Sequence, residues 1–312
     1  MKIMANSVSV MSKGSAGKKA SERIAEIIFV VCAFAAVAAV ASITLYMIIS
    51  GTPALFQVGL VDILFSSTWN PTGTVPEYGI LNVILTSIVG TAAAVLIGVP
   101  IGVLTAVFLA ETAPKRLASI VRPAVELLAG IPSVVYGLLG LLILNPIMYK
   151  LELLIYSGDP SHEFTGGANL LSAVLVLAIM ILPTVINISE SAIRAVPDHL
   201  RSSSLALGAT KIQTIFKVVL PAARSGIAAA VVLGVGRAVG EAMAISLVSG
   251  SVANFPLPFN SVRFLTTAIV SEMSYSSGLH RQVLFTIGLV LFLFIMIINV
   301  VVSRILKKGT EE

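Results

Sequence analysis

Long apolar stretches alternate with short polar stretches along this chain, and the pattern predicts about six membrane-spanning helices. Each apolar stretch is about as long as the helix of roughly 20 residues that crosses 30 Å of hydrocarbon. The stretches are continuously apolar rather than alternating, which favours helices over the strands of a barrel. We therefore expect an all-α membrane protein. The stretches run approximately over 24–50, 80–110, 123–149, 170–192, 221–250 and 282–306.

Composition supports the same class. Of the 312 residues, 57% are hydrophobic and 11% are charged, whereas about 25% are charged in ordinary soluble domains. The only cysteine, Cys32, lies inside the first apolar stretch, so an intrachain disulfide is excluded. No group of histidine, cysteine or carboxylate has metal-ligand spacing, and no nucleophile–base arrangement stands out. An enzyme is therefore not favoured.

Basic residues predict the orientation of the chain. Sixteen Lys and Arg lie in the N-terminal tail, the loops at 111–122 and 193–224 and the C-terminal tail, against three in the alternate loops. The net charge of +5 thus follows the positive-inside rule rather than indicating nucleic acid as a partner, and both termini are expected in the cytoplasm. The first apolar stretch exceeds the 7–15 residues of a signal-peptide core, so an uncleaved anchor is expected.

These boundaries predict five regions. The segment at 51–79 contains the only tryptophan, Trp69, and two interpretations are open: an interfacial helix with Trp69 at headgroup depth, or a loop partly buried against the bundle. The regions are a cytoplasmic basic tail (1–23), a first transmembrane helix (24–50), an extracytoplasmic loop or interfacial segment (51–79), a five-helix core (80–306) and a cytoplasmic tail (307–312).

The longest polar interruption, at 200–220, predicts two short helices joined by a glycine. Leu205, Ala206 and Ala209 are small or apolar before the turn, and Ile212 begins an apolar repeat at helical spacing after it. Gly208 can adopt the turn conformation that other residues resist. A short helix with apolar residues at its tip suits the groove of a partner protein.

This segment resembles the coupling loop of bacterial ABC importer permeases. That pattern is Glu-Ala-Ala, three residues, Gly, nine residues and Ile-x-Leu-Pro; Gly208 and the ending at 218–221 fit it. The Glu-Ala-Ala positions fall on three serines at 202–204, so the acidic residue is missing. The resemblance implies that the loop couples the chain to an ATPase, with the contact residues Leu205, Ala206, Gly208, Ala209, Thr210 and Ile212.

Three further stretches, at 108–116, 127–137 and 234–244, are similar to the Pst phosphate permeases. The Met-Ala at 243–244 is similar to the PstC-type subunits, and the resemblance extends over roughly 75–305. It implies a type I ABC importer permease fold in the cytoplasmic membrane of a bacterium or archaeon. The implied function is that of a transport subunit, not an enzyme, for ATP-driven import of inorganic phosphate.

The same resemblance implies the partners. They are a second, PstA-like permease, two cytosolic PstB-like ATPase subunits, an extracytoplasmic PstS-like phosphate-binding protein and membrane lipid, with no nucleic acid. ATP and Mg²⁺ would be bound by the ATPase partners, and this chain would bind no cofactor itself.

Arg237 and Glu241 are the expected residues of the substrate pathway. They lie four positions apart in the fifth apolar stretch, which would place them on one helical face. An arginine at a membrane helix centre costs about 2.5–3.5 kcal/mol, so it usually faces a partner or a pathway. A packing ion pair and a phosphate-binding group both remain open, because arginine suits an oxyanion through its forked donors. Glycines at 234, 236 and 240 would leave room for the ion.

Three alternatives remain. An ABC permease for another oxyanion, such as sulfate or molybdate, would carry the same general coupling loop. A self-sufficient secondary transporter would need no ATPase and should show internal repeats, which the sequence does not reveal. An intramembrane enzyme is the third alternative, and it is the least favoured because the sequence shows no catalytic residues.

Overall fold

The computed structural model describes residues 16–311, so the first part of the expected basic tail and the last residue lie outside the described residues. It divides into two units, Met1–Ile49 and Ser50–Glu312. Within the described part, six helices are long and apolar enough to span a membrane, which confirms the all-α prediction. They are Glu22–Gln57, Leu81–Thr112, Ser133–Tyr156, Leu170–Arg194, Lys211–Gly240 and Gly278–Val301.

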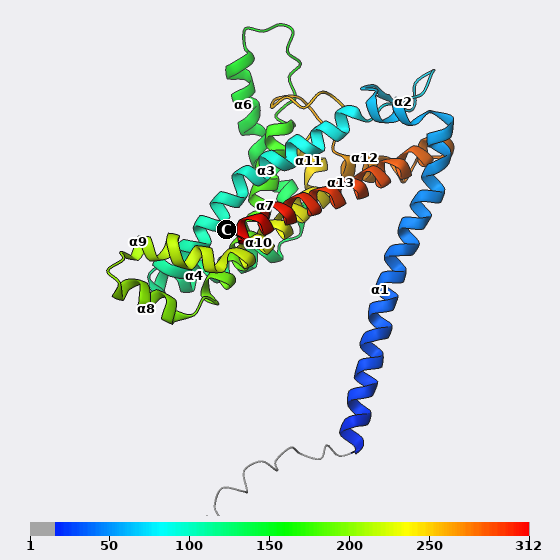
Figure 1. Ribbon diagram of the computed structural model, residues 1–312. Helices are drawn as coiled ribbons and strands as arrows, with labels where there is room; N and C mark the ends of the chain where they lie inside the picture. Colours follow the sequence, from blue (N-terminus) through cyan, green and yellow to red (C-terminus); the bar gives the residue numbers. More distant parts are fainter. Residues whose placement is uncertain (1–15, 312) are drawn as a thin grey trace, which may run out of the picture. The chain divides into compact units, whose positions relative to one another are not determined.

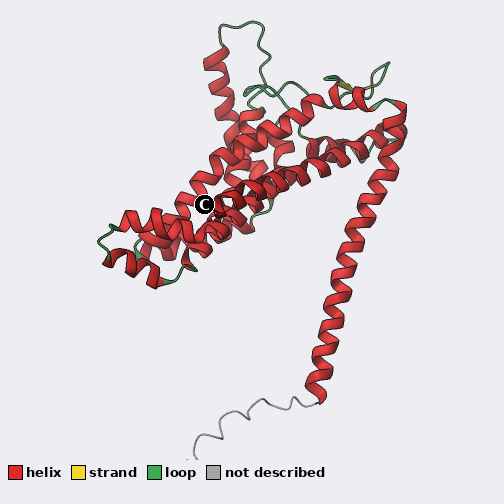
Figure 2. Cartoon of the chain, viewed as in Figure 1, coloured by secondary structure: helices red, strands yellow, loops and turns green. Residues whose placement is uncertain are grey.

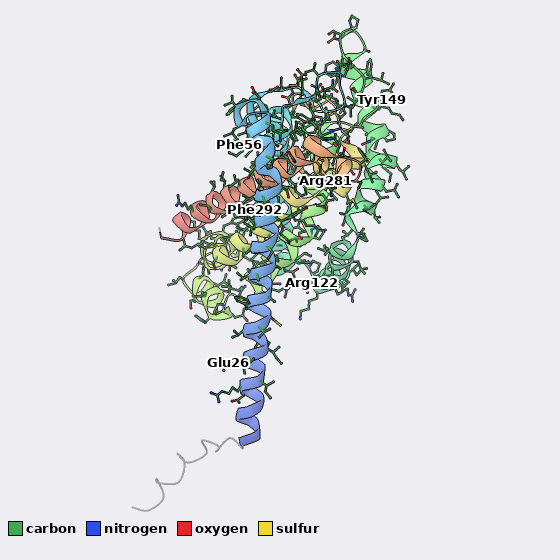
Figure 3. All side chains as sticks on the ribbon, turned by 90° about the vertical axis from the view of Figure 1, so that its right-hand side faces the viewer. Glu26, Phe56, Arg122, Tyr149, Arg281 and Phe292 are labelled. Atoms are coloured by element: carbon green, nitrogen blue, oxygen red, sulfur yellow. The ribbon has the colours of Figure 1, made fainter. Side chains whose placement is uncertain are left out.

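The first unit is formed by α1 (Ala16–Gln57), which continues past the predicted end of the first span into the second unit. Its side chains project on all sides of the helix, from Glu26 near its beginning to Phe56 near its end (Figure 3). Apolar side chains such as Phe34 are largely exposed. A helix that is apolar all round suits a lipid environment.

The second unit is built around α7 (Leu170–Arg194), which packs against both α3 (Leu81–Val107) and α10 (Leu220–Gly240) (Figure 1). Small residues allow the close approach of α3 to α7. A Cβ placed on Gly98 would lie 2.7 Å from Cδ1 of Ile181, and one on Gly102 would lie 2.8 Å from Val185. Close backbone packing through glycines is a common source of association between helices in a membrane.

The other elements cover this core, and almost all of them are helical (Figure 2). α13 packs against α10 and α12, and α5 packs against α11. Their bounds are α4 Lys115–Gly130, α5 Ser133–Leu139, α6 Asn145–Tyr156, α8 Asp198–Ala206, α9 Lys211–Thr214, α11 Met243–Val248, α12 Leu265–Glu272 and α13 Gly278–Glu311.

The segment after α1 packs on the bundle on one side and exposes apolar side chains of α2 on the other. It contains α2 (Leu60–Phe65) and a short antiparallel hairpin of β1 (Trp69–Asn70) and β2 (Glu77–Tyr78). Ile63 is fully buried in a cluster with residues of α3, α12 and α13. The indole Nε1 of Trp69 donates to Oε1 of Glu272 at 3.2 Å.

Three helices contain a π turn two residues before a proline. The turns η1 (Phe108–Thr112), η2 (Gly140–Leu144) and η3 (Ile215–Val219) precede Pro114, Pro146 and Pro221. Proline lacks an N–H, and its ring clashes with the carbonyl four residues earlier. A π turn contains one extra residue and displaces that carbonyl. After η2 and η3 the helix therefore continues through its proline.

Two predicted stretches contain helix breaks that hydropathy does not reveal. The third stretch, predicted over 123–149, is divided where α4 ends at Gly130. Ile131 has an extended backbone, because the residue before a proline, here Pro132, disfavours the helical conformation. Its membrane span begins only at Ser133. The fifth, predicted over 221–250, is divided between α10 and α11.

Candidate functional site

The predicted helix–glycine–helix loop is present as α8, Gly208 and α9. Gly208 has a φ of +86°, in the left-handed region, and no atom lies within 4 Å of a Cβ placed there. Its N–H donates to the carbonyl of Leu205 at 3.0 Å, which closes the end of α8. Thr210 starts α9 with a capping box, in which its hydroxyl accepts from the N–H of Gln213 and the Gln213 side chain accepts from the N–H of Thr210. The turn is therefore specified by residue type at both ends.

The tip of this loop presents apolar side chains outward. Leu205 is 50% exposed and Ile212 is 70% exposed, while Ala206, Gly208 and Thr210 are exposed and Ala209 is half-buried. Leu207, which the sequence reasoning did not select, is 90% exposed and is the most prominent apolar side chain of the loop. Its position directly before the glycine was the available signal.

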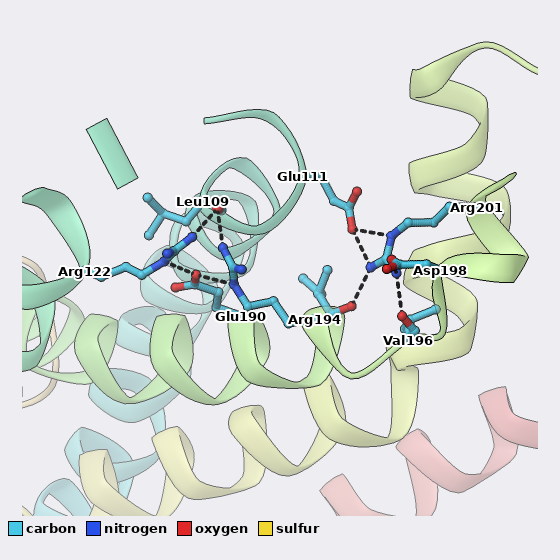
Figure 4. A network of polar contacts seen from close by, with 9 residues as sticks. Leu109, Glu111, Arg122, Glu190, Arg194, Val196, Asp198 and Arg201 are labelled. Carbon is cyan, nitrogen blue, oxygen red and sulfur yellow. Dashed lines mark hydrogen bonds and ion pairs between the residues drawn. The ribbon is translucent and has the colours of Figure 1, made fainter. Parts of the chain in front are cut away.

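Arg201 attaches α8 to the end of the bundle (Figure 4). Its Nη2 and Nε donate to Oε1 of Glu111 at 2.7 and 3.1 Å, and both side chains are mostly buried. The guanidinium also donates to the carbonyls of Ile193, in the last turn of α7, and of Val196, just after that helix, and it pairs with Asp198 at 3.1 Å. One side chain thus joins α8, η1 and α7.

A second ion network lies beside the first (Figure 4). Glu190 of α7, which is 8% exposed, accepts from Nε of Arg122 at 2.5 Å and from Nε of Arg194 at 2.9 Å. The Nη2 of each arginine donates to the carbonyl of Leu109, at 3.1 and 3.2 Å. Sequence reasoning missed both networks. Glu190–Arg194 and Asp198–Arg201 are local pairs at helical spacing, but the contacts that join them to Arg122 and Glu111 are far apart in the chain.

Arg237 and Glu241 do not share a helical face, and the expected geometry is wrong. α10 ends at Gly240, and Glu241 has an extended ψ of 131°. Its carboxylate accepts from the N–H of Ala244 at 2.8 Å, and Nη1 of Arg237 donates to Oγ1 of Thr184 on α7 at 3.1 Å. Among the contacts of the described residues, no ion pair joins Arg237 to Glu241. The carboxylate caps α11 in place of pairing with the arginine.

The surroundings of Arg237 are open on one side only. A Cβ on Gly236 or Gly240 would meet no atom within 4 Å, whereas one on Gly234 would lie 2.9 Å from Val185. Gly234 therefore packs against α7 and leaves no room for an ion. Arg237 and Glu241 are each half-buried at the point where the chain changes from α10 to α11. Such interrupted helices place polar groups at mid-membrane depth in many transporters.

The opposite end of the bundle from α8 holds a polar hollow of about 650 Å³. It lies between the loops at 157–169 and 249–262 (Figure 2). The backbone N–H groups of Leu170 and Leu171, at the beginning of α7, donate to the carbonyls of Asn260 and Pro258 in the second loop. Histidine, serine, threonine and asparagine side chains contribute to its lining together with one carboxylate, Glu163, so most of its polar surface is neutral and hydrogen-bonding.

Glu152 holds the first of these loops. It is fully buried and accepts from Thr165 through the N–H at 2.9 Å, and it pairs with Nε2 of His162 at 2.9 Å. Within the same loop, the hydroxyl and N–H of Ser161 donate to Asp159 at 2.6 and 2.9 Å, and these hydrogen bonds hold the pKa of Asp159 below its usual value. The loop is therefore ordered by its own polar contacts.

Comparison with known proteins places these features in a family context. The family model described as "Binding-protein-dependent transport system inner membrane component" matches residues 98–309. The probable ABC transporter permease protein YqgH of Bacillus subtilis is 39% identical over 282 residues, 88% of each chain. The phosphate transport system permease protein PstC of Pasteurella multocida is 36% identical over 80% of each chain. PstC of Xylella fastidiosa is 35% identical over 88% of this chain and 87% of its own.

Two solved structures share the fold. One shows inward-facing conformations of the MetNI methionine ABC transporter, with a TM-score of 0.56 and 20% identity over 74% of this chain and 96% of that one. The other is a bacterial ABC transporter involved in the import of alginate, with a TM-score of 0.61 and 16% identity over 93% of this chain and 99% of that one. At these identities the likeness shows the fold alone, and it confirms the predicted ABC importer permease architecture.

Proposed function

This chain belongs to the family of binding-protein-dependent transport system inner membrane components, and we propose that it is a permease subunit of an ATP-driven importer for inorganic phosphate. The observation that carries the proposal is its similarity to proteins named as phosphate transport permeases, at 36% identity over 80% of both chains in one case. The family match includes both the α8–α9 loop and the Arg237 region.

The division of labour follows from the family. An importer of this kind works with ATPase subunits and with a binding protein that delivers the substrate. We assign the ATPase to the exposed apolar tip of the α8–α9 loop, which is shaped for a partner's groove. The binding protein would then dock at the opposite end, around the polar hollow. This assignment puts both termini in the cytoplasm, in agreement with the positive-inside distribution of Lys and Arg.

Arg237 is the proposed contact for the ion in transit. It is held by a single described hydrogen bond, to Thr184, so most of its five N–H donors remain for an anion. The two exposed glycines beside it leave space. Glu241 acts differently from the original expectation: it stabilises the break between α10 and α11, which places Arg237 at the end of its helix.

Reconstituted uptake tests the function. Proteoliposomes should contain this chain with a PstA-like permease and PstB-like ATPase subunits, together with a PstS-like binding protein. We expect uptake of labelled phosphate that requires ATP and resists excess unlabelled sulfate or molybdate. Uptake of sulfate or molybdate in place of phosphate would instead support the other-oxyanion function. Phosphate uptake that persists without the ATPase subunits would contradict the ABC mechanism.

A further inference from the structure

A second hollow, of about 340 Å³, opens at the α8 end of the bundle between α4 and α7. Its lining residues on α7 begin at Asn187, about one helical turn beyond Thr184, the partner of Arg237, and continue toward the end of the helix. Its walls are polar: Arg122 and Glu126 come from α4, and Asn187, Glu190, Ser191 and Arg194 come from α7.

The two arginines of this hollow are held in fixed positions with donors unused. Each gives its Nε to Glu190 and its Nη2 to the carbonyl of Leu109. Among the contacts of the described residues, the Nη1 of Arg122 and the Nη1 of Arg194 have no acceptor. Their side chains are 33% and 46% exposed, so these groups are accessible. Two guanidinium groups are thus preorganised around one space, which lowers the entropic cost of binding an anion.

The charges favour an anion, although carboxylates are present. The 8%-exposed Glu190 neutralises one of the two arginines that contact it, so these three side chains together carry one net positive charge. Glu126 is exposed at the rim, where solvent and salt screen its charge. Asn187 and Ser191 add neutral polar groups to the wall.

We propose that this hollow, which we call the α4–α7 hollow, binds a phosphoryl group at the cytoplasmic face of the protein. Arginine binds phosphoryl oxygens through parallel hydrogen bonds, and two rigid guanidinium groups suit a tetrahedral anion. Two sources supply that chemistry there: the phosphate delivered by the importer, and the headgroup of an anionic phospholipid. The proposal rests on the proposed function in two respects only: the placement of the hollow on the cytoplasmic side, and imported phosphate as one source of the anion.

The test uses a charge placed in the hollow without breaking the ion network. Asn187→Asp is nearly isosteric and adds a carboxylate to the wall, whereas Ser225→Asp adds the same charge at an exposed position of α10 outside the hollow. Binding is measured on the purified complex without transport, from the shift in thermal unfolding temperature. One arm titrates inorganic phosphate in neutral-lipid nanodiscs, and the other compares nanodiscs of phosphatidylglycerol and phosphatidylcholine.

We expect one arm to stabilise the wild type and the Ser225→Asp variant, with binding weakened by about tenfold in Asn187→Asp because a like charge is added close to the anion. An effect in the phosphate arm identifies the free ion, and an effect in the phosphatidylglycerol arm identifies the lipid. Arg194→Lys keeps the charge next to Glu190 but loses the forked donors, so it should weaken binding as well and serves if Asn187→Asp does not fold. Equal responses of all variants in both arms overturn the proposal. Because no transport is measured, a failure of the phosphate-import function leaves this result readable.

Discussion

The Arg201–Glu111 pair should be the strongest single attachment of the coupling loop to the bundle. Arg201→Gln removes two hydrogen bonds to Glu111, at 2.7 and 3.1 Å, and leaves that carboxylate 11% exposed without its counter-charge. Breaking one side of a buried ion pair costs about 3–5 kcal/mol. Because Arg201 retains 19% exposure, we expect the lower end of that range, about 3 kcal/mol.

The double variant Glu111→Gln, Arg201→Gln separates the stranded charge from the lost hydrogen bonds. With both charges absent, the remaining loss should be that of one or two ordinary hydrogen bonds, about 1–2 kcal/mol. Asp198→Asn is the matched control in the same network. Asp198 is 99% exposed, and an exposed pair contributes about 0–1 kcal/mol.

The measurement is the denaturant midpoint of the purified permease in mixed micelles, together with ATP-driven phosphate uptake by the assembled complex. Arg201→Gln should fall well below the double variant in stability, and the difference is the energy of the stranded charge. Uptake should follow attachment of the loop. If Arg201→Gln is no less stable than Asp198→Asn, the pair does not hold α8 and our reasoning is wrong.

Three further predictions concern the glycine turn, the ion contact and the topology. Gly208→Val forces a β-branched residue to φ +86°, which costs about 1–2 kcal/mol of strain. Membrane insertion should persist, while ATPase association or uptake is lost. The control Gly158→Val, at an open position without a positive φ, should behave as wild type in the same assays. Arg237→Gln should lower phosphate uptake severely, with normal protein level and normal complex assembly. Thr184→Val, which removes only the neutral acceptor of Arg237, should lower uptake far less. Near-normal uptake by Arg237→Gln would remove this residue from the pathway. In a Cys32→Ser background, a cysteine at Ser161 should react with an impermeant thiol reagent from outside and one at Ser203 should not, and outside labelling at Ser203 would reverse the proposed orientation.

The helices could be predicted because a membrane imposes a simple requirement on the sequence. A span needs about 20 apolar residues, and the fourth predicted stretch, at 170–192, agrees closely with α7 (Leu170–Arg194). The turn at Gly208 was predictable for a similar reason. Few residues other than glycine accept a positive φ, so a single residue between two helical patterns specified the geometry.

The breaks inside apolar stretches were not predictable from hydropathy. Ile131-Pro132 and Glu241-Ala242 interrupt helices without adding enough polar residues to end an apolar stretch. A spacing of four implies one face only if the helix is continuous, so the predicted pairing of Arg237 with Glu241 failed at Gly240. The alternative partners of these two groups, Thr184 and the N–H of Ala244, are set by packing and local backbone geometry.

The long-range ion pairs near α8 lay outside the reach of sequence reasoning, although the local pairs Glu190–Arg194 and Asp198–Arg201 have helical spacing. Arg201 and Glu111 are 90 positions apart, and Arg122 and Glu190 are 68 apart. Charged residues in loops satisfied the positive-inside rule without further explanation. The structure shows that the same residues also bind one another, so topology signals and structural ion pairs share the same side chains at this end of the protein.

The π turn at Ile215–Val219 has a consequence for helical phase. One added residue rotates everything beyond it by about 100° relative to a regular α-helix. α9 and α10 form one continuous span across that turn, yet their faces follow different phases. Deleting a single residue there would restore the regular repeat and rotate α9, with the loop before it, about the axis of α10. The direction in which Ile212 of α9 faces is therefore determined by one additional residue in the helix that carries it.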